Sequence, residues 1–292
     1  MPYVYIVSAQ KDFNLDESVD KLAKSTNLIL NFKVSGKFND TKGAIYEIEG
    51  NNAQKIIKEC VMSGLYDFDI LYLDKVPSLS LPGVLVLDMD MTSVLIEGID
   101  EIARRVGVFD KVAAITNAAM HGGMDFAESL TKRVSMLKGG DANVIDDVKT
   151  IMKQMPGLDS LLDITLGHFS RGICSGGFVQ LICVLEEKYK LEMVKANSLE
   201  IIDGKFTGRL NSAIVDAEAK RLGVLDLMAR NQVKKDQVIV LGDGANDLKM
   251  IAEAGVGIAY HAKPLVREKA PCTLDHCDLG AVTLLLKLGS KI

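Results

Sequence analysis

Residues 83–92, GVLVLDMDMT, decide how most of this chain folds. The first five are all apolar or glycine, as expected of a strand buried on both faces of a sheet. The run ends in the carboxylate of Asp88, and Asp90 and Thr92 follow at intervals of two residues. Charge at the end of a core strand is costly unless a partner offsets it. The stretch therefore predicts a functional site at this strand end.

Short apolar runs of the same kind recur along the chain, and helical patterns separate them. They are VLVLD (84–88), RGICS (171–175), MVKAN (193–197), VIVLGD (238–243) and VGIAY (256–260). This alternation is typical of a parallel sheet with helices on both faces. More than 70 residues rich in helical patterns separate the first two runs, which is too long for a simple crossover. We therefore expect a helical lid inserted after the first strand.

The first 73 residues show a different order of elements. Strand and helix patterns alternate as βαββαβ, which predicts a ferredoxin-like plait. No set of polar side chains converges there, so a structural or dimerising module and a ligand sensor both stay open. The segment DKVPSLSLPG (74–83) indicates the joint. We expect one unit at 1–76 and a second at 77–292, in which a cap at about 97–155 interrupts a core of 77–96 and 156–292.

Composition excludes several classes of function. The net charge of −5 and the lack of basic runs argue against nucleic-acid binding. No apolar stretch is long enough to span a bilayer, and the N-terminus lacks the pattern of a secretory signal. Five cysteines without a framework spacing favour free thiols. We therefore expect a cytoplasmic protein that acts on a small molecule.

Three strand ends carry polar side chains. One ends in Asp88, another in Ser175 with Gly176 beyond it, and a third in Asp243. Ligands of open parallel sheets bind at these ends, so the side chains should meet. A single aspartate there is usually a helix cap, but several carboxylates at one mouth repel each other unless a cation is present. Oxygen ligands that share a shell with phosphate and water favour Mg²⁺.

The residues around the carboxylates narrow the chemistry. SGGF (175–178) could hold phosphate oxygens with backbone N–H groups, or it could simply form a tight turn. GDGAND (242–247) is not a dinucleotide fingerprint, and the chain has no P-loop motif. Lys220 in DAEAKRLGVL is either a solvated surface residue or a cation that points into the same mouth.

These residues carry a resemblance to a known family. Asp88-Met-Asp-Met-Thr, Ser175-Gly-Gly, Lys220 and GDGAND resemble the four motifs of the haloacid-dehalogenase (HAD) phosphatase superfamily. IEGIDEIARRVG (96–107), MDFAESLTKRVSMLKG (124–139) and GDGANDLKMIAEAGVGIAYHAKP (242–264) resemble the phosphoserine phosphatases in order and spacing. The resemblance covers about residues 74–286. It implies an α/β fold with a HAD-like doubly wound parallel sheet and a helical cap, and the N-terminal unit is similar to ACT-like domains.

The resemblance implies Mg²⁺-dependent hydrolysis of O-phosphoserine, the last step of serine biosynthesis. Asp88 would be the nucleophile that forms an aspartyl-phosphate. Asp90 would protonate the leaving serine oxygen and then activate water. Mg²⁺ would be held by the Asp88 carboxylate, the Asp90 backbone carbonyl and Asp243, with Asp247 behind them. Ser175, Gly176 and Lys220 would bind phosphate oxygens, and Asn246 would help to hold the substrate.

The cap residues would give specificity. The resemblance implies that Glu97 pairs with the substrate ammonium, that Arg133 pairs with its carboxylate, and that Phe126 shields the pocket from water. From the residues alone, the preferred interpretations are that Arg133 is exposed helix surface and that Phe126 belongs to the cap core. Met91 departs from the family, in which serine is usual at this position.

Two other functions stay open, and the first of them would use nearly the same residues. A phosphotransferase would pass the phosphoryl group to the hydroxyl of another amino acid, and only product analysis with an acceptor present distinguishes it. A sensor would read an amino acid through the N-terminal unit while the phosphatase core stays idle, but the chemical positions from Asp88 to Asp247 are all present. A homodimer through the N-terminal unit is a further expectation.

Overall fold

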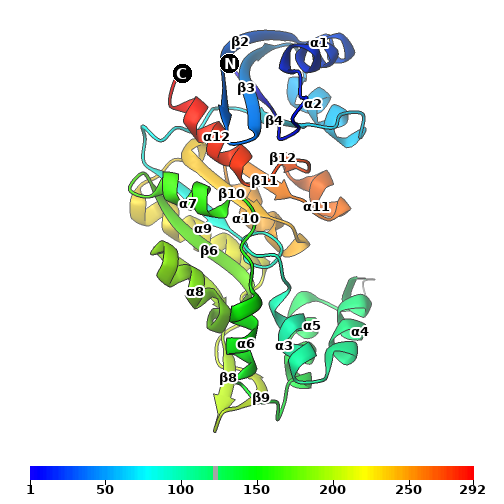
Figure 1. The fold of residues 1–292 in the computed structure, drawn as a ribbon, viewed down its shortest axis with the longest axis vertical. Coiled ribbons are helices and arrows are strands. Elements are labelled where there is room, and N and C mark those ends of the chain that lie inside the picture. Colours follow the sequence, from blue (N-terminus) through cyan, green and yellow to red (C-terminus); the bar gives the residue numbers. More distant parts are fainter. Residues whose placement is uncertain (121–123) are drawn as a thin grey trace.

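The computed structural model describes residues 1–120 and 124–292, and two sheets organise it. Figure 1 shows the N-terminal sheet at one end of the molecule, the second sheet in the middle, and a group of helices with a hairpin at the other end. The first sheet has four antiparallel strands, and the second has six parallel strands.

The N-terminal elements follow the predicted βαββαβ order. They are β1 (Tyr3–Ser8), α1 (Leu15–Thr26), β2 (Ile29–Phe38), β3 (Thr41–Glu49), α2 (Ala53–Met62) and β4 (Asp69–Leu73). The sheet order β2-β3-β1-β4 is that of the predicted ferredoxin-like plait. Helix α1 begins where the side chain of Asn14 accepts the Glu17 N–H at 3.3 Å, which caps one of the free donors of the first turn.

Both faces of this sheet are covered, because successive side chains of a strand point to opposite sides. On β1, Val4 and Ile6 join the apolar cluster beneath α1 and α2. Tyr5 and Val7 instead join the main core of the molecule. On that side the hydroxyl of Tyr5 donates to the carbonyl of Ala281 in α12 (Gly280–Gly289) at 2.9 Å. The second face of the sheet therefore packs on the C-terminal helix.

A buried carboxylate fixes the same junction at another point. Asp69, at the start of β4, is 3% exposed. Its oxygens accept the backbone N–H groups of Asp275 at 2.7 Å and Cys277 at 2.8 Å, and that of His276 at 3.2 Å. Burial raises the pKa of Asp69, while these hydrogen bonds oppose the rise. The contact ties β4 to the loop between β12 (Cys272–Leu274) and α12.

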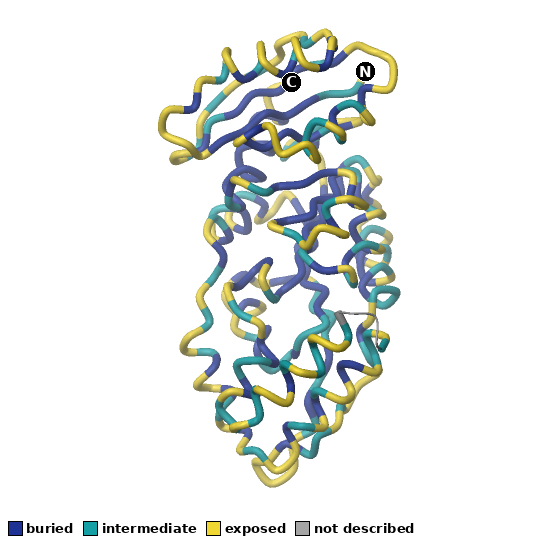
Figure 2. Tube along the Cα trace, turned by 90° about the vertical axis from the view of Figure 1, so that its right-hand side faces the viewer, coloured by how far each residue is buried: buried dark blue, intermediate teal, exposed yellow. Residues whose placement is uncertain are grey.

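The parallel sheet confirms the doubly wound fold and all five predicted strands. Its strands are β5 (Gly83–Leu87), β6 (Phe169–Phe178), β7 (Met193–Asn197), β10 (Val238–Gly242), β11 (Val256–Tyr260) and β12. Their order is β12-β11-β10-β5-β6-β7. Every residue of β5, β10 and β11 is buried. Figure 2 shows buried segments running through the interior of the molecule, with exposed ones along its outline. The strand order reverses between β5 and β10, and ligands bind beyond the carboxyl ends of strands at such a switch point.

Helices cover both faces of this sheet. Leu85 and Leu87 of β5 belong to one core cluster, and Val84 and Val86 belong to another. The first cluster includes residues of α7 (Leu158–Thr165), α8 (Val179–Tyr189) and α12. The second includes residues of α9 (Ala217–Asn231), α10 (Leu248–Glu253) and α11 (Pro264–Lys269). Two 3₁₀ turns, η1 (Lys235–Gln237) and η2 (Ala245–Asp247), lie on either side of β10 in the chain.

The predicted lid is present as helices α3 (Gly98–Arg105), α4 (Phe109–Met120), α5 (Phe126–Met136) and α6 (Val144–Ile151), which lie between β5 and β6 in the chain. Residues 199–210 fall within the predicted core segment 156–292, and they form an unpredicted hairpin of β8 (Leu199–Ile202) and β9 (Lys205–Leu210). In the structure, Gly139 donates to Phe206 O at 2.8 Å, and Phe206 donates to Gly140 O at 3.0 Å. The hairpin therefore packs on the lid. The unit boundaries at 76, 97 and 155 stay predictions.

No helix in the described part of the chain is both long enough and apolar enough to cross a bilayer. All five cysteines are free, and three of them are buried. Free thiols agree with the reduced state that their spacing predicts, and the cytoplasmic location stays a prediction.

Candidate active site

Two neighbouring strands of the parallel sheet bring their terminal carboxylates together. Asp88 follows β5, Asp243 follows β10, and Leu87 is in register with Leu241. The Asp88 N–H donates to Leu241 O at 2.9 Å, which holds the two strand ends side by side. Carboxylate oxygens of Asp88, Asp243 and Asp247 all lie within 4.8 Å of one another. The prediction that the strand ends of β5 and β10 converge is therefore confirmed.

Lys220 lies among these carboxylates rather than on the surface. Asp216 caps α9 by accepting the Ala219 N–H at 2.8 Å, so Lys220 is in the first helical turn. Its ammonium contacts Asp88 Oδ1 at 2.8 Å and Asp247 Oδ1 at 2.6 Å, and its side chain is 0% exposed. Burial alone would lower the pKa of Lys220, but the charges of Asp247 and Asp88 outweigh it and raise the pKa. The lysine therefore stays protonated.

One ammonium does not balance three carboxylates. Burial first, and then the charge of Asp88, raise the pKa of Asp243 to about 6. The same two causes raise the pKa of Asp247, although Lys220 opposes them. The remaining negative charge and the oxygen-only ligand set suit a hard divalent cation. The cluster could therefore hold a metal ion.

Asp90 lies between the core and the first cap helix. Its Oδ1 accepts the N–H of Gly98 at 2.8 Å. A methyl group built on Gly177 would lie only 2.6 Å from Asp90 Oδ2, so the glycine leaves room for the carboxylate. Burial, and then the charges of Glu97 and Asp88, raise the pKa of Asp90 well above its ordinary value. Asp90 can therefore keep a proton at pH values where an exposed aspartate would have lost it.

The segment Ser175-Gly176-Gly177 continues strand β6, which extends to Phe178, further than predicted. The hydroxyl of Ser175 accepts the Gly177 N–H at 2.8 Å. A methyl group on Gly176 would lie 2.7 Å from the Phe126 ring and 3.6 Å from the Asn246 amide nitrogen. Phe126 therefore covers Gly176 from the cap, while Asn246 approaches the same glycine from η2.

The cap also contributes Glu97 and Arg133. Glu97 occupies the N-cap position of α3, and Arg133 lies in the last turn of α5. The Nε atom of Arg133 is buried without a hydrogen-bond partner. Desolvation lowers the pKa of Arg133, and the charges of Glu97, Asp100 and Asp90 oppose the shift. The guanidinium of Arg133 is therefore within reach of the charges of carboxylates from both the cap and the core.

Sequence reasoning missed Lys263. The N–H of Lys263 donates to the carbonyl of Asp243 at 3.3 Å, beyond the end of β11. Desolvation raises the pKa of Glu97, and the charge of Lys263 is the largest effect that opposes this rise. The sequence did contain a signal for this residue. VGIAY (256–260) was a predicted strand, and ligands bind at the carboxyl ends of parallel strands, so the residues that follow it were candidates too.

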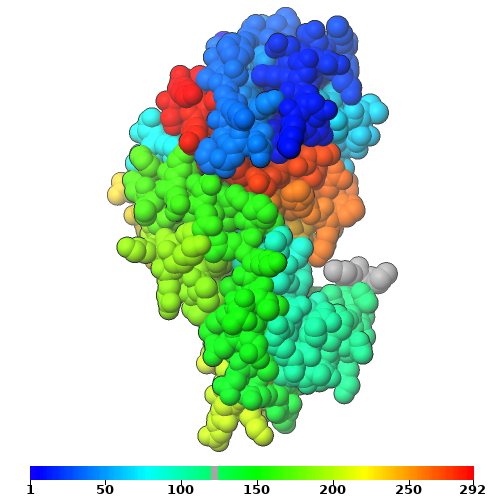
Figure 3. Space-filling view, viewed as in Figure 1, coloured from blue at the N-terminus to red at the C-terminus, as the bar shows by residue number. Residues whose placement is uncertain are grey.

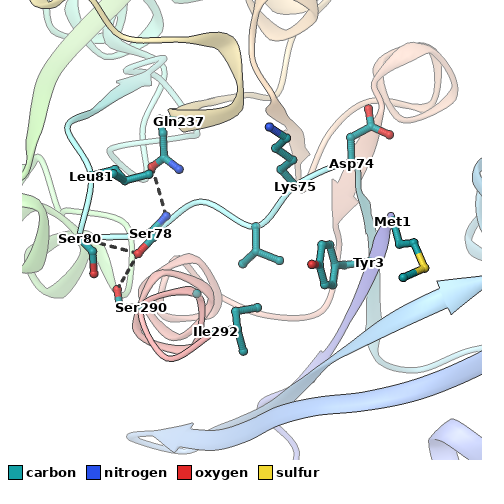
Figure 4. Close-up of a pocket in the computed structure, with 12 residues that line it drawn as sticks. Met1, Tyr3, Asp74, Lys75, Ser78, Ser80, Leu81, Gln237, Ser290 and Ile292 are labelled. Atoms are coloured by element: carbon teal, nitrogen blue, oxygen red, sulfur yellow. Dashed lines mark hydrogen bonds between the residues drawn. The ribbon is translucent and has the colours of Figure 1, made fainter.

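A separate cavity of about 450 Å³ lies where the N-terminal strand, the joint and the end of α12 meet. Tyr3, Lys75, Ser78, Gln237 and Ser290 are among the residues that line it (Figure 4). Ser78 N–H donates to Gln237 Oε1 at 3.2 Å there. None of the predicted site residues lines this cavity.

Comparison with known proteins agrees with this geometry. A family model described as haloacid dehalogenase-like hydrolase matches residues 192–286. A phosphoserine phosphatase of Vibrio cholerae is 40% identical over 230 residues, or 78% of this chain and 70% of the relative. The crystal structure of a probable phosphoserine phosphatase from Vibrio cholerae, unliganded, matches with a TM-score of 0.80 at 32% identity, over 99% of this chain and 87% of that one. A phospho-aspartyl intermediate analogue of phosphoserine phosphatase matches with a TM-score of 0.65 at 32% identity, over 69% of this chain and 97% of the other. The chain therefore belongs to the phosphoserine phosphatase family of haloacid dehalogenase-like hydrolases.

Proposed function

We propose that this protein hydrolyses O-phosphoserine to serine and inorganic phosphate, with Mg²⁺ as cofactor. The observation that carries the proposal is the environment of Asp88. Its carboxylate lies at a strand end, contacts a fully buried lysine at 2.8 Å, and belongs to a cluster of three carboxylates that could hold a metal ion. The named relatives support the same activity. In a cell this reaction would complete serine synthesis.

The residues fit a two-step phosphoryl transfer. Asp88 would attack phosphorus, and the bond from phosphorus to the serine oxygen would break as the aspartyl-phosphate forms. Asp90 would give its proton to the leaving oxygen, and then take a proton from the water that attacks the same phosphorus. Phosphate release would restore Asp88. The raised pKa of Asp90 and its position two residues beyond Asp88 support this role.

The carboxylate cluster fits Mg²⁺, because all its donors are hard oxygens and its negative charge exceeds that of the one lysine. The Asp88 and Asp243 carboxylates and the Asp90 backbone carbonyl would hold the ion, with Asp247 behind them. A bound ion would neutralise charge that develops on the phosphoryl oxygens. Lys220 would hold the Asp88 carboxylate in place through its contact at 2.8 Å.

Substrate binding would use both the core and the cap. Ser175, Gly176, Lys220 and Asn246 would contact phosphate oxygens and hold the substrate. Arg133 would bind the substrate carboxylate, and its buried Nε without a partner supports a role in binding an anion. Glu97 would pair with the ammonium, and Phe126 would exclude water above Gly176.

The N-terminal unit, residues 1–76, would be an ACT-like module joined to the phosphatase unit 77–292. A homodimer through this unit would use an edge rather than a face, because helices cover both faces of its sheet. Strand β2 is at one edge, and Ile29 and Phe32 on it are 59% and 60% exposed. The measurement that tests this is the molar mass of the full chain in solution.

The nucleophile is tested with Asp88→Asn. We expect phosphate release from phosphoserine in Mg²⁺ to fall to background while the circular dichroism spectrum stays unchanged. Asp203→Asn, on an exposed turn of the hairpin, is the matched control and should keep full activity. Substantial turnover by Asp88→Asn would contradict the nucleophile assignment, and a phosphorylated product formed with an added amino acid would favour the phosphotransferase.

Substrate recognition is tested with Arg133→Ala. We expect KM for phosphoserine to rise far more than KM for p-nitrophenyl phosphate, which has no carboxylate. Equal changes for the two substrates would remove Arg133 from carboxylate recognition. Removal of divalent ions with a chelator should abolish both activities, and added Mg²⁺ should restore them.

A further inference from the structure

Asn197, the last residue of β7, is a buried polar side chain to which the proposed function gives no role. It is 0% exposed. Its Nδ2 donates to the carbonyl of Gly176 at 2.8 Å, and its Oδ1 accepts the N–H of Val215 at 2.8 Å. Because a carbonyl can only accept and an N–H can only donate, these partners fix which way the amide faces. Asn197 therefore joins the end of β6 to the segment that precedes α9.

An irregularity in the sheet explains why Gly176 needs this partner. Strands β6 and β7 pair in parallel, but their register shifts between Cys174 and Phe178, so that residues 175–177 lie opposite a single residue of β7. Residues that bulge out of a ladder lose their strand partners, and such bulges often re-aim side chains beside active sites. The side chain of Asn197 replaces the missing ladder partner of the Gly176 carbonyl.

The bond from Asn197 holds one side of a peptide plane whose other side is also held. The carbonyl of Gly176 and the N–H of Gly177 belong to the same plane and point in opposite directions. Asn197 donates to the carbonyl, while the hydroxyl oxygen of Ser175 accepts the N–H at 2.8 Å. The plane therefore cannot turn without breaking both bonds.

The second of these bonds decides what the hydroxyl of Ser175 can do. A hydroxyl has two lone pairs that accept and one proton that it donates. Because the Gly177 N–H occupies a lone pair, the proton of Ser175 points elsewhere, and the described residues provide no acceptor for it. Ser175 is 1% exposed, and a buried hydroxyl without an acceptor favours a ligand that supplies one. A phosphate oxygen is such an acceptor.

The other end of the Asn197 amide ties this segment to the cation of the site. Val215, which donates to Oδ1 of Asn197, immediately precedes Asp216, the N-cap of α9. Lys220 lies in the first turn of that helix. Ser175 and Lys220, which are both proposed to bind phosphate, thus come from different elements that Asn197 holds in a fixed relative position.

A small ligand can approach these elements from the surface. Figure 3 shows a notch between the orange segment that contains α11 and the teal cap helices. Because the cap follows the carboxyl end of β5 in the chain, this notch lies on the side of the sheet where the parallel strands end (Figure 1).

We propose that Asn197 is a positioning residue for phosphate binding: its amide fixes the Gly176–Gly177 peptide, and this peptide directs the hydroxyl of Ser175 to donate to a phosphate oxygen. Asn197 itself does not contact the phosphate. The inference rests on the proposed function, since it takes Ser175 to bind the phosphate group of the substrate.

The experiment measures the dissociation constant of inorganic phosphate by isothermal titration calorimetry, on the full chain in saturating Mg²⁺. We expect Asn197→Ala to raise this constant about tenfold, because the anion loses a correctly oriented donor. The value of kcat/KM should fall by similar factors on phosphoserine and on p-nitrophenyl phosphate, which share the phosphate group. Asn231→Ala is the matched control and should behave as wild type. Its Nδ2 also donates to a carbonyl, that of Leu227 at 2.9 Å, but at the end of α9 opposite Lys220.

A double-mutant cycle separates positioning from a general loss of structure. In a Ser175→Ala background there is no hydroxyl to direct, so Asn197→Ala should change the phosphate dissociation constant and kcat/KM on p-nitrophenyl phosphate by less than about threefold. The same tenfold effect in both backgrounds would mean that Asn197 does not act through Ser175, and it would overturn the proposal.

If circular dichroism shows that Asn197→Ala does not fold, Asn197→Ser, which keeps a polar group at this position, replaces it with the same expectations. An unchanged dissociation constant in a folded variant, or a wild type that binds no phosphate, would also contradict the proposal. Failure of the proposed function has a different signature. Wild type would then bind phosphate but leave phosphoserine intact, and the comparison of dissociation constants would still decide the role of Asn197.

Discussion

Removal of the buried ammonium by Lys220→Met should destabilise the protein strongly, apart from any effect on catalysis. Lys220 is 0% exposed and contacts Asp88 and Asp247 at 2.8 and 2.6 Å, and these carboxylates are 7% and 0% exposed. Methionine fills much of the same volume without charge. The variant therefore keeps the packing but leaves two buried carboxylates without their cation.

The expected magnitude follows from burial. Removing one partner of a buried ion pair costs about 3–5 kcal/mol, because the other charge stays buried and uncompensated. Lys220 serves two carboxylates, so the loss in free energy of unfolding should lie toward the upper end of this range in metal-free protein. The loss should shrink as pH falls, because protonation of the carboxylates removes the uncompensated charge.

The assay is urea unfolding in a chelating buffer at pH 7.5 and again at pH 5. Lys132→Met is the matched control, since Lys132 pairs with Glu128 at the similar distance of 2.7 Å but the two side chains are 50% and 49% exposed. We expect that variant to lose only about 0.5 kcal/mol. A loss below about 1 kcal/mol for Lys220→Met, or an equal loss at both pH values, would refute the reasoning.

Three further predictions concern other residues. Since the folded-state pKa of Asp243 is raised to about 6 from 3.8, metal-free protein should lose stability as pH rises from about 4 to about 7, and Asp243→Asn should flatten that decline in thermal-melting curves. Met91 has a left-handed backbone with φ of 55°, so Met91→Gly should raise the free energy of unfolding by about 0.5–1 kcal/mol while Met91→Ala gives no such gain. Asp69→Asn replaces an acceptor with an amide opposite three N–H groups, so it should cost about 2 kcal/mol in urea unfolding; a cost near zero would show that the junction does not depend on this carboxylate.

The local sequence pattern was sufficient to predict the main strands of the parallel sheet and part of the site. Apolar runs of strand length predicted β5, β6, β7, β10 and β11, because burial on both faces leaves a continuous apolar signature. The edge strand β12 was missed, since it has only three residues and carries too little pattern. The hairpin β8–β9 was not predicted, and its packing on the lid could not be, because sequence order does not show which unit a hairpin packs on.

The site residues also divide into those that the sequence could predict and those that it could not. The carboxylates Asp88 and Asp243 could be predicted to meet, because the ends of parallel strands share one edge of the sheet. The sequence did not predict whether the side chain of Lys220 lies on the surface or in the site. Helix periodicity alone does not show where the side chain of a first-turn residue points. Lys263 went unnoticed because it follows its strand by three residues and has no acidic neighbour in the chain.

The sequence by itself determined which segments are buried, where chemistry interrupts them, and to which family the motifs are similar. These properties depend on the hydrophobic periodicity and on short spacings between residues, both of which are local features of the sequence. Only the tertiary structure decided that Lys220 bridges two carboxylates, that Phe126 covers Gly176, and that Asp69 holds the N-terminal sheet to the loop before α12. Each of these contacts joins residues far apart in the chain, and their meeting depends on strand order and packing that no local spacing records.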